Sequence, residues 1–203
     1  IWRTRGGEMI RWRDYPIFTE SISTLKDTSI DKHDIGNPAY MTERDDPAVD
    51  FDLVKEKYIE HLGLSDVPKS NDALLDRGKG KLAFIEFKNG YIDSKKQFDI
   101  RKKIYDSTLI FTDIVSAGIS DMRRCVEYVL VYNENANRQN PATAEKKREV
   151  QNSASFDDFA RRMGGLAGEE YVCFGLKMFE NYCFEKVHTY TEREFQGYLK
   201  ALQ

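Results

Sequence analysis

The chain of 203 residues carries a formal net charge of −3, and 40% of its residues are hydrophobic and 12% aromatic. This composition excludes wholesale disorder and is sufficient for the core of one domain of good size, with or without an appendage. The acidic balance argues against a nonspecific DNA coat, which would be strongly basic.

Cysteine and histidine usage narrows the classes of protein further. The three cysteines lack close pairing, which predicts reduced thiols in a cytoplasmic protein. The three histidines are far apart in the sequence and argue against a zinc site. No apolar run is long enough to cross a bilayer, so we expect no membrane partner.

The first 49 residues are expected to form an N-terminal segment of loop with a strand or two. Arginine alternates with tryptophan over Ile1–Arg13, a composition that can contact nucleic acid by charge and stacking. A mobile terminus explains the same composition equally well. From Pro16 to Pro47 the pattern is weak and indicates no chemistry.

Residues 50–134 are expected to form the core of the fold, and they begin with a helix. Asp50 can cap the start of this helix, and Gly63 can end it. Glu56 and Glu60 stand four residues apart and share one face, where they form either a solvated acidic surface or a source of metal ligands. The helical spacing is carried by Phe51, Val54, Tyr58 and Leu62.

A β-hairpin is predicted next, and the rest of the chain is organised around it. Two apolar runs, Ala73–Leu75 and Leu82–Phe87, flank a turn signal with two glycines at Arg77–Gly80. Because successive side chains of a strand point to opposite faces, Glu86 and Lys88 are neighbours on one face.

The hairpin can bring a second carboxylate to Glu86, and Asp72 and Asp76 are both candidates. Two carboxylates beside the ammonium of Lys88 suit a hard divalent cation, since Mg²⁺ binds a few carboxylate oxygens and keeps several waters. The lysine could orient or activate a metal-bound water, or stabilise charge that develops on a phosphate.

An acidic residue in one strand and Glu-x-Lys in the next resembles the PD-(D/E)xK nuclease-like superfamily. The resemblance covers roughly residues 50–134. It implies that Asp72, Glu86 and Lys88 are catalytic, and that Asp72 and Glu86 bind Mg²⁺ or Mn²⁺. It also implies nucleic acid, with DNA expected, as the partner.

Two features bear on this resemblance. Asn71 stands where the superfamily pattern has proline, and Asp76 competes with Asp72 because it lies nearer the turn. Many members carry a glutamate on the preceding helix that helps to bind the metal. This implies Glu60, or alternatively Glu56, as a further metal ligand.

The Glu-x-Lys motif is short, and about one copy is expected by chance in a chain of this length. A second copy stands in a polar stretch at Glu145–Lys147. The strand, the hairpin partner and the helix that follows favour the first copy. The alternative is that Glu86 and Lys88 form a solvated ion pair on the open face of an antiparallel sheet.

A long helix is predicted from Lys95 to about Ser116. We expect its cations to lie near the hairpin and contact phosphates, or else to form an ordinary solvated face. The basic residues are Lys95, Lys96, Arg101, Lys102 and Lys103, and the apolar side is expected from Phe98, Ile104, Tyr105, Leu109, Ile110 and Phe111.

The segment Cys125–Tyr132 has the β-branched and aromatic content of a buried central strand. Helix, hairpin, helix and strand follow the α-β-β-α-β order that the resembled restriction-endonuclease-like fold requires. We therefore predict an α/β (α+β) fold in which helices flank a mixed central β-sheet.

Residues 135–203 are expected to form a C-terminal α+β extension packed on the same domain. It could extend the sheet or form a lobe for the choice of partner or substrate. The expected elements are an exposed loop in which Lys146, Lys147 and Arg148 offer a second phosphate contact, a helix at Ser155–Met163, strands at Glu170–Leu176 and Tyr182–Tyr190, and a final helix to Leu202 with a capping box at Thr191 and Glu194.

These patterns favour a metal-dependent nuclease that hydrolyses phosphodiester bonds. Phage defence, restriction and mobile-element processing are compatible settings, as are a homodimer and a separate targeting subunit. The alternative is a catalytically inactive nuclease-fold module that binds nucleic acid or protein. A serine or cysteine hydrolase is not supported, because no nucleophile elbow or legible triad is present.

Overall fold

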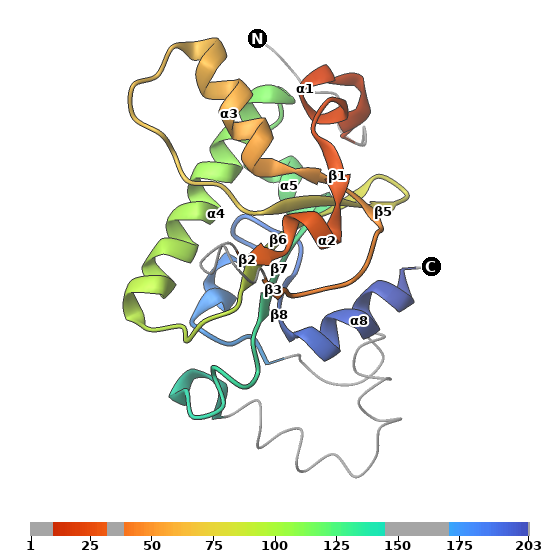
Figure 1. The fold of residues 1–203 in the computed structure, drawn as a ribbon. Helices are drawn as coiled ribbons and strands as arrows, with labels where there is room; N and C mark the ends of the chain where they lie inside the picture. The colour runs from red at the N-terminus through yellow and green to blue at the C-terminus, as the bar shows by residue number, and fades with distance from the viewer. Residues whose placement is uncertain (1–9, 32–38, 145–170, 203) are drawn as a thin grey trace.

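A mixed β-sheet of six strands forms the centre of the computed structural model, which describes residues 10–31, 39–144 and 171–202 (Figure 1). The strand order is β1-β4-β5-β6-β7-β8, with antiparallel pairing from β1 to β6 and parallel pairing from β6 to β8. The expected mixed sheet is therefore confirmed. Its strands are β1 (Ile22–Thr24), β4 (Pro47–Asp50), β5 (Ala73–Gly78), β6 (Lys81–Lys88), β7 (Val126–Tyr132) and β8 (Val187–Thr191).

Helices cover both faces of this sheet. On one face, apolar side chains of α3 (Phe51–Leu62), α4 (Ser94–Ile114) and α5 (Ile119–Cys125) pack in one cluster with the sheet. On the other face, α2 (Leu25–Thr28) and α8 (Glu192–Ala201) pack in a second cluster. The short elements are η1 (Trp12–Asp14), α1 (Pro16–Thr19), η2 (Pro141–Thr143), η3 (Leu176–Phe179) and a separate two-stranded sheet of β2 (Ile30–Asp31) and β3 (Ala39–Tyr40).

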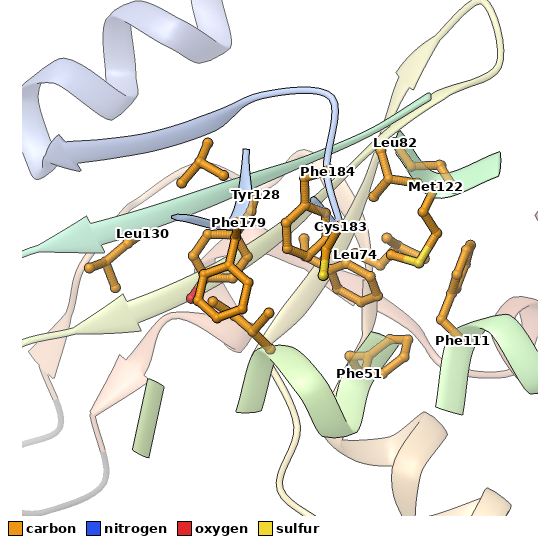
Figure 2. Close-up of a cluster of buried hydrophobic side chains, with 14 of the residues drawn as sticks. Phe51, Leu74, Leu82, Phe111, Met122, Tyr128, Leu130, Phe179, Cys183 and Phe184 are labelled. Carbon is orange, nitrogen blue, oxygen red and sulfur yellow. The ribbon is translucent and has the colours of Figure 1, made fainter. Parts of the chain in front are cut away.

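Phe84 of β6 lies at the centre of the first cluster. Its ring centroid is 4.9 Å from that of Phe51 on α3 and 5.6 Å from that of Phe111 on α4. Figure 2 shows Phe51, Phe111 and Phe184 among the side chains gathered in this cluster. Because helices cover both faces, β6 is buried along nearly its whole length, and a polar side chain on it is withdrawn from water.

The predicted hairpin is confirmed as β5 and β6, which pair antiparallel. Gly78, Lys79 and Gly80 form the turn with φ of 78°, 53° and 73°. Two glycines at these positions make such a left-handed run accessible, since glycine has no Cβ to clash there. Ala73 pairs with Ile85, so the preceding Asp72 comes level with Glu86.

The two helices predicted around the hairpin are also confirmed. In α3 the Asp50 carboxylate accepts a hydrogen bond from the backbone N–H of Leu53 (3.1 Å), and Gly63 ends the helix with a φ of 64°. In α4 the Asp93 carboxylate accepts from the N–H of Lys96 (2.8 Å). These short-range caps are legible from sequence because they join residues only three positions apart.

The expected apolar side of α4 is partly wrong. Phe98 and Leu109 are 67% and 66% exposed, whereas Ile104, Ile110 and Phe111 are buried as expected. The small polar residues Ser107 and Thr108 complete the buried face of α4. The buried residues of α4 are Ile100, Ile104, Ser107, Thr108, Ile110 and Phe111.

The C-terminal segment extends the sheet, since β8 pairs parallel with β7. The strand expected at Glu170–Leu176 is wrong over its described part, because Phe174 and Gly175 have φ of 60° and 66° and turn the chain into η3. The strand expected at Tyr182–Tyr190 begins only at Val187. Helix α5 was not predicted.

The predicted capping box of α8 is confirmed. The N–H of Thr191 donates to the Glu194 carboxylate (2.7 Å), and the N–H of Glu194 donates to the Thr191 hydroxyl (3.3 Å). This box starts the helix that covers the second face of the sheet, where Phe195 is fully buried.

The N-terminal segment forms the expected strands, as β1, β2, β3 and β4, but it is less irregular than expected. It adds α1 and α2, and Trp12 is 8% exposed and packed in the core. The indole N–H of Trp12 donates to Asp76 (3.2 Å), so this ring does not offer the stacking surface that its composition indicated. The expected helix at 155–163 and the cations at 146–148 lie outside the described residues.

Among the residues that the structure describes, no helix combines the length and the apolar character that crossing a bilayer requires.

Candidate functional site

Asp72 and Glu86 meet beside α4, and one ammonium joins them. Nζ of Lys103 lies 3.0 Å from Oδ1 of Asp72 and 2.7 Å from Oε1 of Glu86. Nζ of Lys88 also donates to Oε1 of Glu86. Across the hairpin, the backbone N–H of Phe87 donates to Oδ2 of Asp72 (2.6 Å). Two carboxylates and two ammonium groups therefore form one cluster, which we call the carboxylate–lysine cluster.

The cluster is largely withdrawn from water. The side chain of Glu86 is 0% exposed, and those of Asp72, Lys88 and Lys103 are 17%, 21% and 19% exposed. The alternative of a solvated ion pair on an open sheet face is therefore wrong for Glu86. Burial of charge is costly unless it is paired, and the two lysines supply that pairing.

The two carboxylate oxygens of Glu86 differ in their hydrogen bonding. Oε1 accepts from both lysines, while Oε2 is buried and has no hydrogen-bond partner among the described residues. The hydroxyl of Tyr128 is likewise buried without a partner among them. Buried polar atoms are normally paired, so an unpaired carboxylate oxygen marks unused capacity to bind a cation or a water.

Burial and neighbouring charges shift the pKa values of Asp72 and Lys103. Burial, and then the charge of Glu86, raises the pKa of Asp72 to about 6 against the opposing effect of the lysines. Burial acts to lower the pKa of Lys103, but the charges of Glu86 and Asp72 outweigh it and raise this pKa above its ordinary value. Lys103 is therefore held as a cation.

A pocket of about 500 Å³ opens beside the cluster. Its walls come from segments far apart in the sequence, including α2, β2, the start of α3 and the start of α4. Charged side chains of both signs line it, which suits a polar ligand that carries a cation. The charged lining residues include Asp50, Asp52, Lys69, Asp72, Lys88, Lys96, Asp99 and Lys103.

Asp52 on α3 is the acidic wall residue that the sequence did not single out. Its carboxylate accepts from the hydroxyl of Ser70 and from Lys55 (3.0 Å). Burial acts to raise the pKa of Asp52, but these hydrogen bonds outweigh it and lower this pKa overall, so the group is ionised at neutral pH. Nearby, Nζ of Lys69 lies 2.6 Å from Asp99.

The structure distinguishes the two candidates for the first acid. Asp72 reaches Glu86 through Lys103, whereas Asp76 accepts from Trp12 and lies 3.0 Å from Arg13. Asp76 pairs with Leu82 in the ladder, four residues from Glu86 along β6, so it cannot share the cluster.

The helix glutamates are not brought to the cluster. Glu60 and Glu56 are exposed on α3, and neither lines the pocket. Glu60 stands eight residues after Asp52, which places it about 12 Å further along the helix axis. The acidic side chain that α3 contributes to the pocket wall is therefore Asp52.

The expected phosphate contacts on α4 do not form one surface. Lys96 lines the pocket, but Lys102 does not and pairs instead with Asp106 (2.7 Å). Lys95 is exposed, and Arg101 is half-buried. Lys103, grouped with these cations by sequence, instead points inward to the carboxylates. Helical spacing shows which residues share a face, but only packing on the sheet shows which of them turns inward.

The cluster has two carboxylates within reach of one cation. Across residues 10–31, 39–144 and 171–202, no three His, Cys, Asp or Glu side chains are gathered as a complete set of metal ligands. Mg²⁺ is commonly held by only one or two carboxylates with waters and substrate oxygens. The carboxylates of Asp72 and Glu86, including the unpaired Oε2 of Glu86, are ligands of the kind that such a magnesium site uses.

Comparison of the chain with protein-family models, curated proteins and solved structures found no match.

Proposed function

We propose that the protein is a metal-dependent nuclease of the PD-(D/E)xK type that cleaves nucleic acid. The observation that carries this proposal is the meeting of Asp72 and Glu86, from adjacent strands, beside Lys88 and a charged pocket. The order α3-β5-β6-α4-α5-β7 around these residues supports it, because it contains the α-β-β-α-β order of the resemblance with only the short α5 inserted before β7.

Each residue has a distinct role in this proposal. Asp72 and Glu86 bind Mg²⁺ or Mn²⁺, and the bound ion supplies Lewis-acid stabilisation of the phosphate and a lowered pKa for its water. Lys88 lies against Glu86 with its ammonium partly exposed to the pocket, where it positions a water or neutralises charge that develops on phosphate. Lys96 supplies a cation along the pocket wall.

The wider setting follows from the same proposal. DNA is the proposed polymer and the cytoplasm the proposed location, with restriction, phage defence or mobile-element processing as the biological role. No helix-turn-helix or zinc module for reading bases stands out in the sequence, so we propose that a homodimer or a separate targeting subunit supplies specificity.

One observation favours the alternative of a catalytically inactive nuclease-fold module. Lys103 already bridges Asp72 and Glu86 with hydrogen bonds of 3.0 and 2.7 Å. With Lys88, it balances both carboxylate charges without any metal. A site satisfied in this way can persist as a structural core while the protein binds nucleic acid or protein through its surface.

The test is a cleavage assay on single- and double-stranded DNA and RNA with Mg²⁺, with Mn²⁺ and with a chelator. The informative pair of variants is Glu86→Gln, which removes the buried carboxylate charge, and Glu60→Gln, which removes an exposed one. Metal-dependent cleavage that is lost in the first variant and retained in the second supports a nuclease. Absence of cleavage on every substrate, together with retained binding, supports the inactive module.

A further inference from the structure

The nuclease proposal leaves one side chain of the carboxylate–lysine cluster without a role, Lys103. Its ammonium occupies the position between Asp72 and Glu86, within 3.0 Å of each carboxylate. We propose that Lys103 is the resident cation of this pair and that a divalent ion binds by displacing it. This inference rests on the proposed function, because it concerns the same carboxylates.

The position of Lys103 on α4 explains why its ammonium lies there. The neighbouring Ile104 is fully buried against the sheet, and the hydroxyl of Ser107 accepts from the N–H of Asn71 (2.8 Å), beside Asp72. These contacts hold α4 against β5 and β6. Only the flexible four-carbon stem of Lys103 then separates the fixed helix from the two carboxylates.

The charges of the cluster explain why Lys103 and a divalent ion would compete for the two carboxylates. Asp72 and Glu86 carry two negative charges when ionised, and Lys88 and Lys103 carry two positive charges. A divalent ion added to this balanced, mostly buried group would face the ammonium of Lys103 at close range, where like charges repel strongly. Departure of Lys103 releases both carboxylates for the ion, so the two cations exclude each other.

The pocket offers space for the displaced side chain of Lys103. Lys103 lines this pocket of about 500 Å³, and its side chain is 19% exposed. In addition, Oε2 of Glu86 is buried and unpaired among the described residues, so the ammonium does not satisfy the whole carboxylate. A cation of higher charge therefore gains more from Glu86 than Lys103 does.

The first experiment measures binding of Mn²⁺ alone by electron paramagnetic resonance of the free ion. It compares the unaltered chain with Lys103→Met and with Lys69→Met as the matched control. Lys69 lies on the wall of the same pocket but pairs with Asp99 instead of the two carboxylates. Both substitutions remove one positive charge from the pocket, but only one removes the competing cation.

The expected result is that Lys103→Met tightens Mn²⁺ binding by about tenfold or more, while Lys69→Met changes it little. An equal gain in Mn²⁺ affinity in both variants would show that the loss of any positive charge from the pocket has this effect. That result would overturn the inference. Unchanged or weaker binding in Lys103→Met would also overturn it. In that case the nuclease proposal still stands if the unaltered chain binds Mn²⁺.

A second measurement needs no variant and decides the question if Lys103→Met fails to fold. The unaltered chain is labelled with acetic anhydride with and without saturating Mg²⁺, and acetylation of Lys103 and Lys102 is followed by mass spectrometry. Displacement into the pocket predicts a several-fold rise for Lys103 with Mg²⁺ and no change for Lys102, whose partner is Asp106. Equal labelling of Lys103 in both conditions contradicts displacement.

The two proposals fail in different ways. If neither the unaltered chain nor Lys103→Met binds Mn²⁺, both the metal site and the competition are excluded. If Lys103→Met alone binds the ion, the competition is supported, and the unaltered chain is an inactive module whose metal site is closed by its own lysine. If both bind equally, only the competition is excluded.

Discussion

The carboxylate of Asp72 is tied to the adjacent strand by a 2.6 Å hydrogen bond from the backbone N–H of Phe87. This bond uses Oδ2 and leaves Oδ1 for Lys103, which also binds Glu86. The hairpin backbone therefore orients one of the two acids before any ligand arrives. A carboxylate oriented in this way is better prepared to bind a cation than one that is free to rotate.

A first prediction concerns the choice between the two acids of β5. We expect Asp72→Asn to lower metal-dependent cleavage by about 100-fold or more, because it removes a charge that would hold the ion. Asp76→Asn is the matched control, since its carboxylate contacts Trp12 and Arg13 outside the cluster. Cleavage rates per folded molecule at saturating Mg²⁺ provide the measurement, and equal losses in both variants would contradict the assignment.

A second prediction concerns stability and pH in the presence of a chelator. Because the pKa of Asp72 is raised to about 6, folding favours its protonated form. Its stabilising contribution is fully present below its unfolded pKa of about 4 and is lost as the pH rises through about 6. Asparagine at position 72 does not ionise, so the variant does not lose this stability as the pH rises. Its side-chain oxygen can still accept the hydrogen bond from the backbone N–H of Phe87.

We therefore expect Asp72→Asn to unfold with a higher free energy than the unaltered chain above pH 6, by about 1 to 3 kcal/mol. The difference should shrink towards pH 4. Urea unfolding at a series of pH values measures it. A variant that is less stable at pH 7 than the unaltered chain would show that the ion pair with Lys103 outweighs the cost of burying the charge.

A third prediction concerns Tyr128, whose hydroxyl is buried without a partner among the described residues. Burial, followed by the nearby charges of Glu86 and Asp72, raises its pKa well above the ordinary value, so the group is neutral. An unpaired buried hydroxyl costs about 1 to 3 kcal/mol, and we expect Tyr128→Phe to stabilise the protein by about 1 kcal/mol. Loss of stability in urea unfolding would reveal a partner such as an internal water.

A fourth prediction concerns the end of α3, where Gly63 has a φ of 64° and nothing lies within 4 Å of the position a Cβ would take. Backbone strain alone then decides the effect of a substitution. Gly63→Ala should cost about 1 kcal/mol, and Gly63→Asn should cost less because asparagine tolerates this conformation. Thermal melting of the two variants compares them, and equal costs would point to a contact instead of strain.

The elements that could be predicted from the sequence are those whose signals are local. The hairpin with its two turn glycines, helix α3 between Asp50 and Gly63, and the capping box at Thr191 and Glu194 each depend on residues within a few positions of one another. The alternation of β6 likewise placed Glu86 and Lys88 on one face. Strand periodicity thus predicted that Glu86 and Lys88 are neighbours, whereas their roles in a site were implied by the resemblance.

Other features were decided only by tertiary packing. Asp72 and Asp76 both precede the turn and stand four residues apart, on one face of an extended chain, and only the ladder register brings Asp72 level with Glu86. Lys103 belongs to a run of cations that look alike in sequence, and only the seating of α4 on the sheet turns its ammonium inward. The burial of Trp12 also depends on tertiary packing, since its hydrogen-bond partner Asp76 lies 64 residues away along the chain. Short-range patterns specify faces and ends of elements, whereas contacts between distant segments depend on how those elements pack.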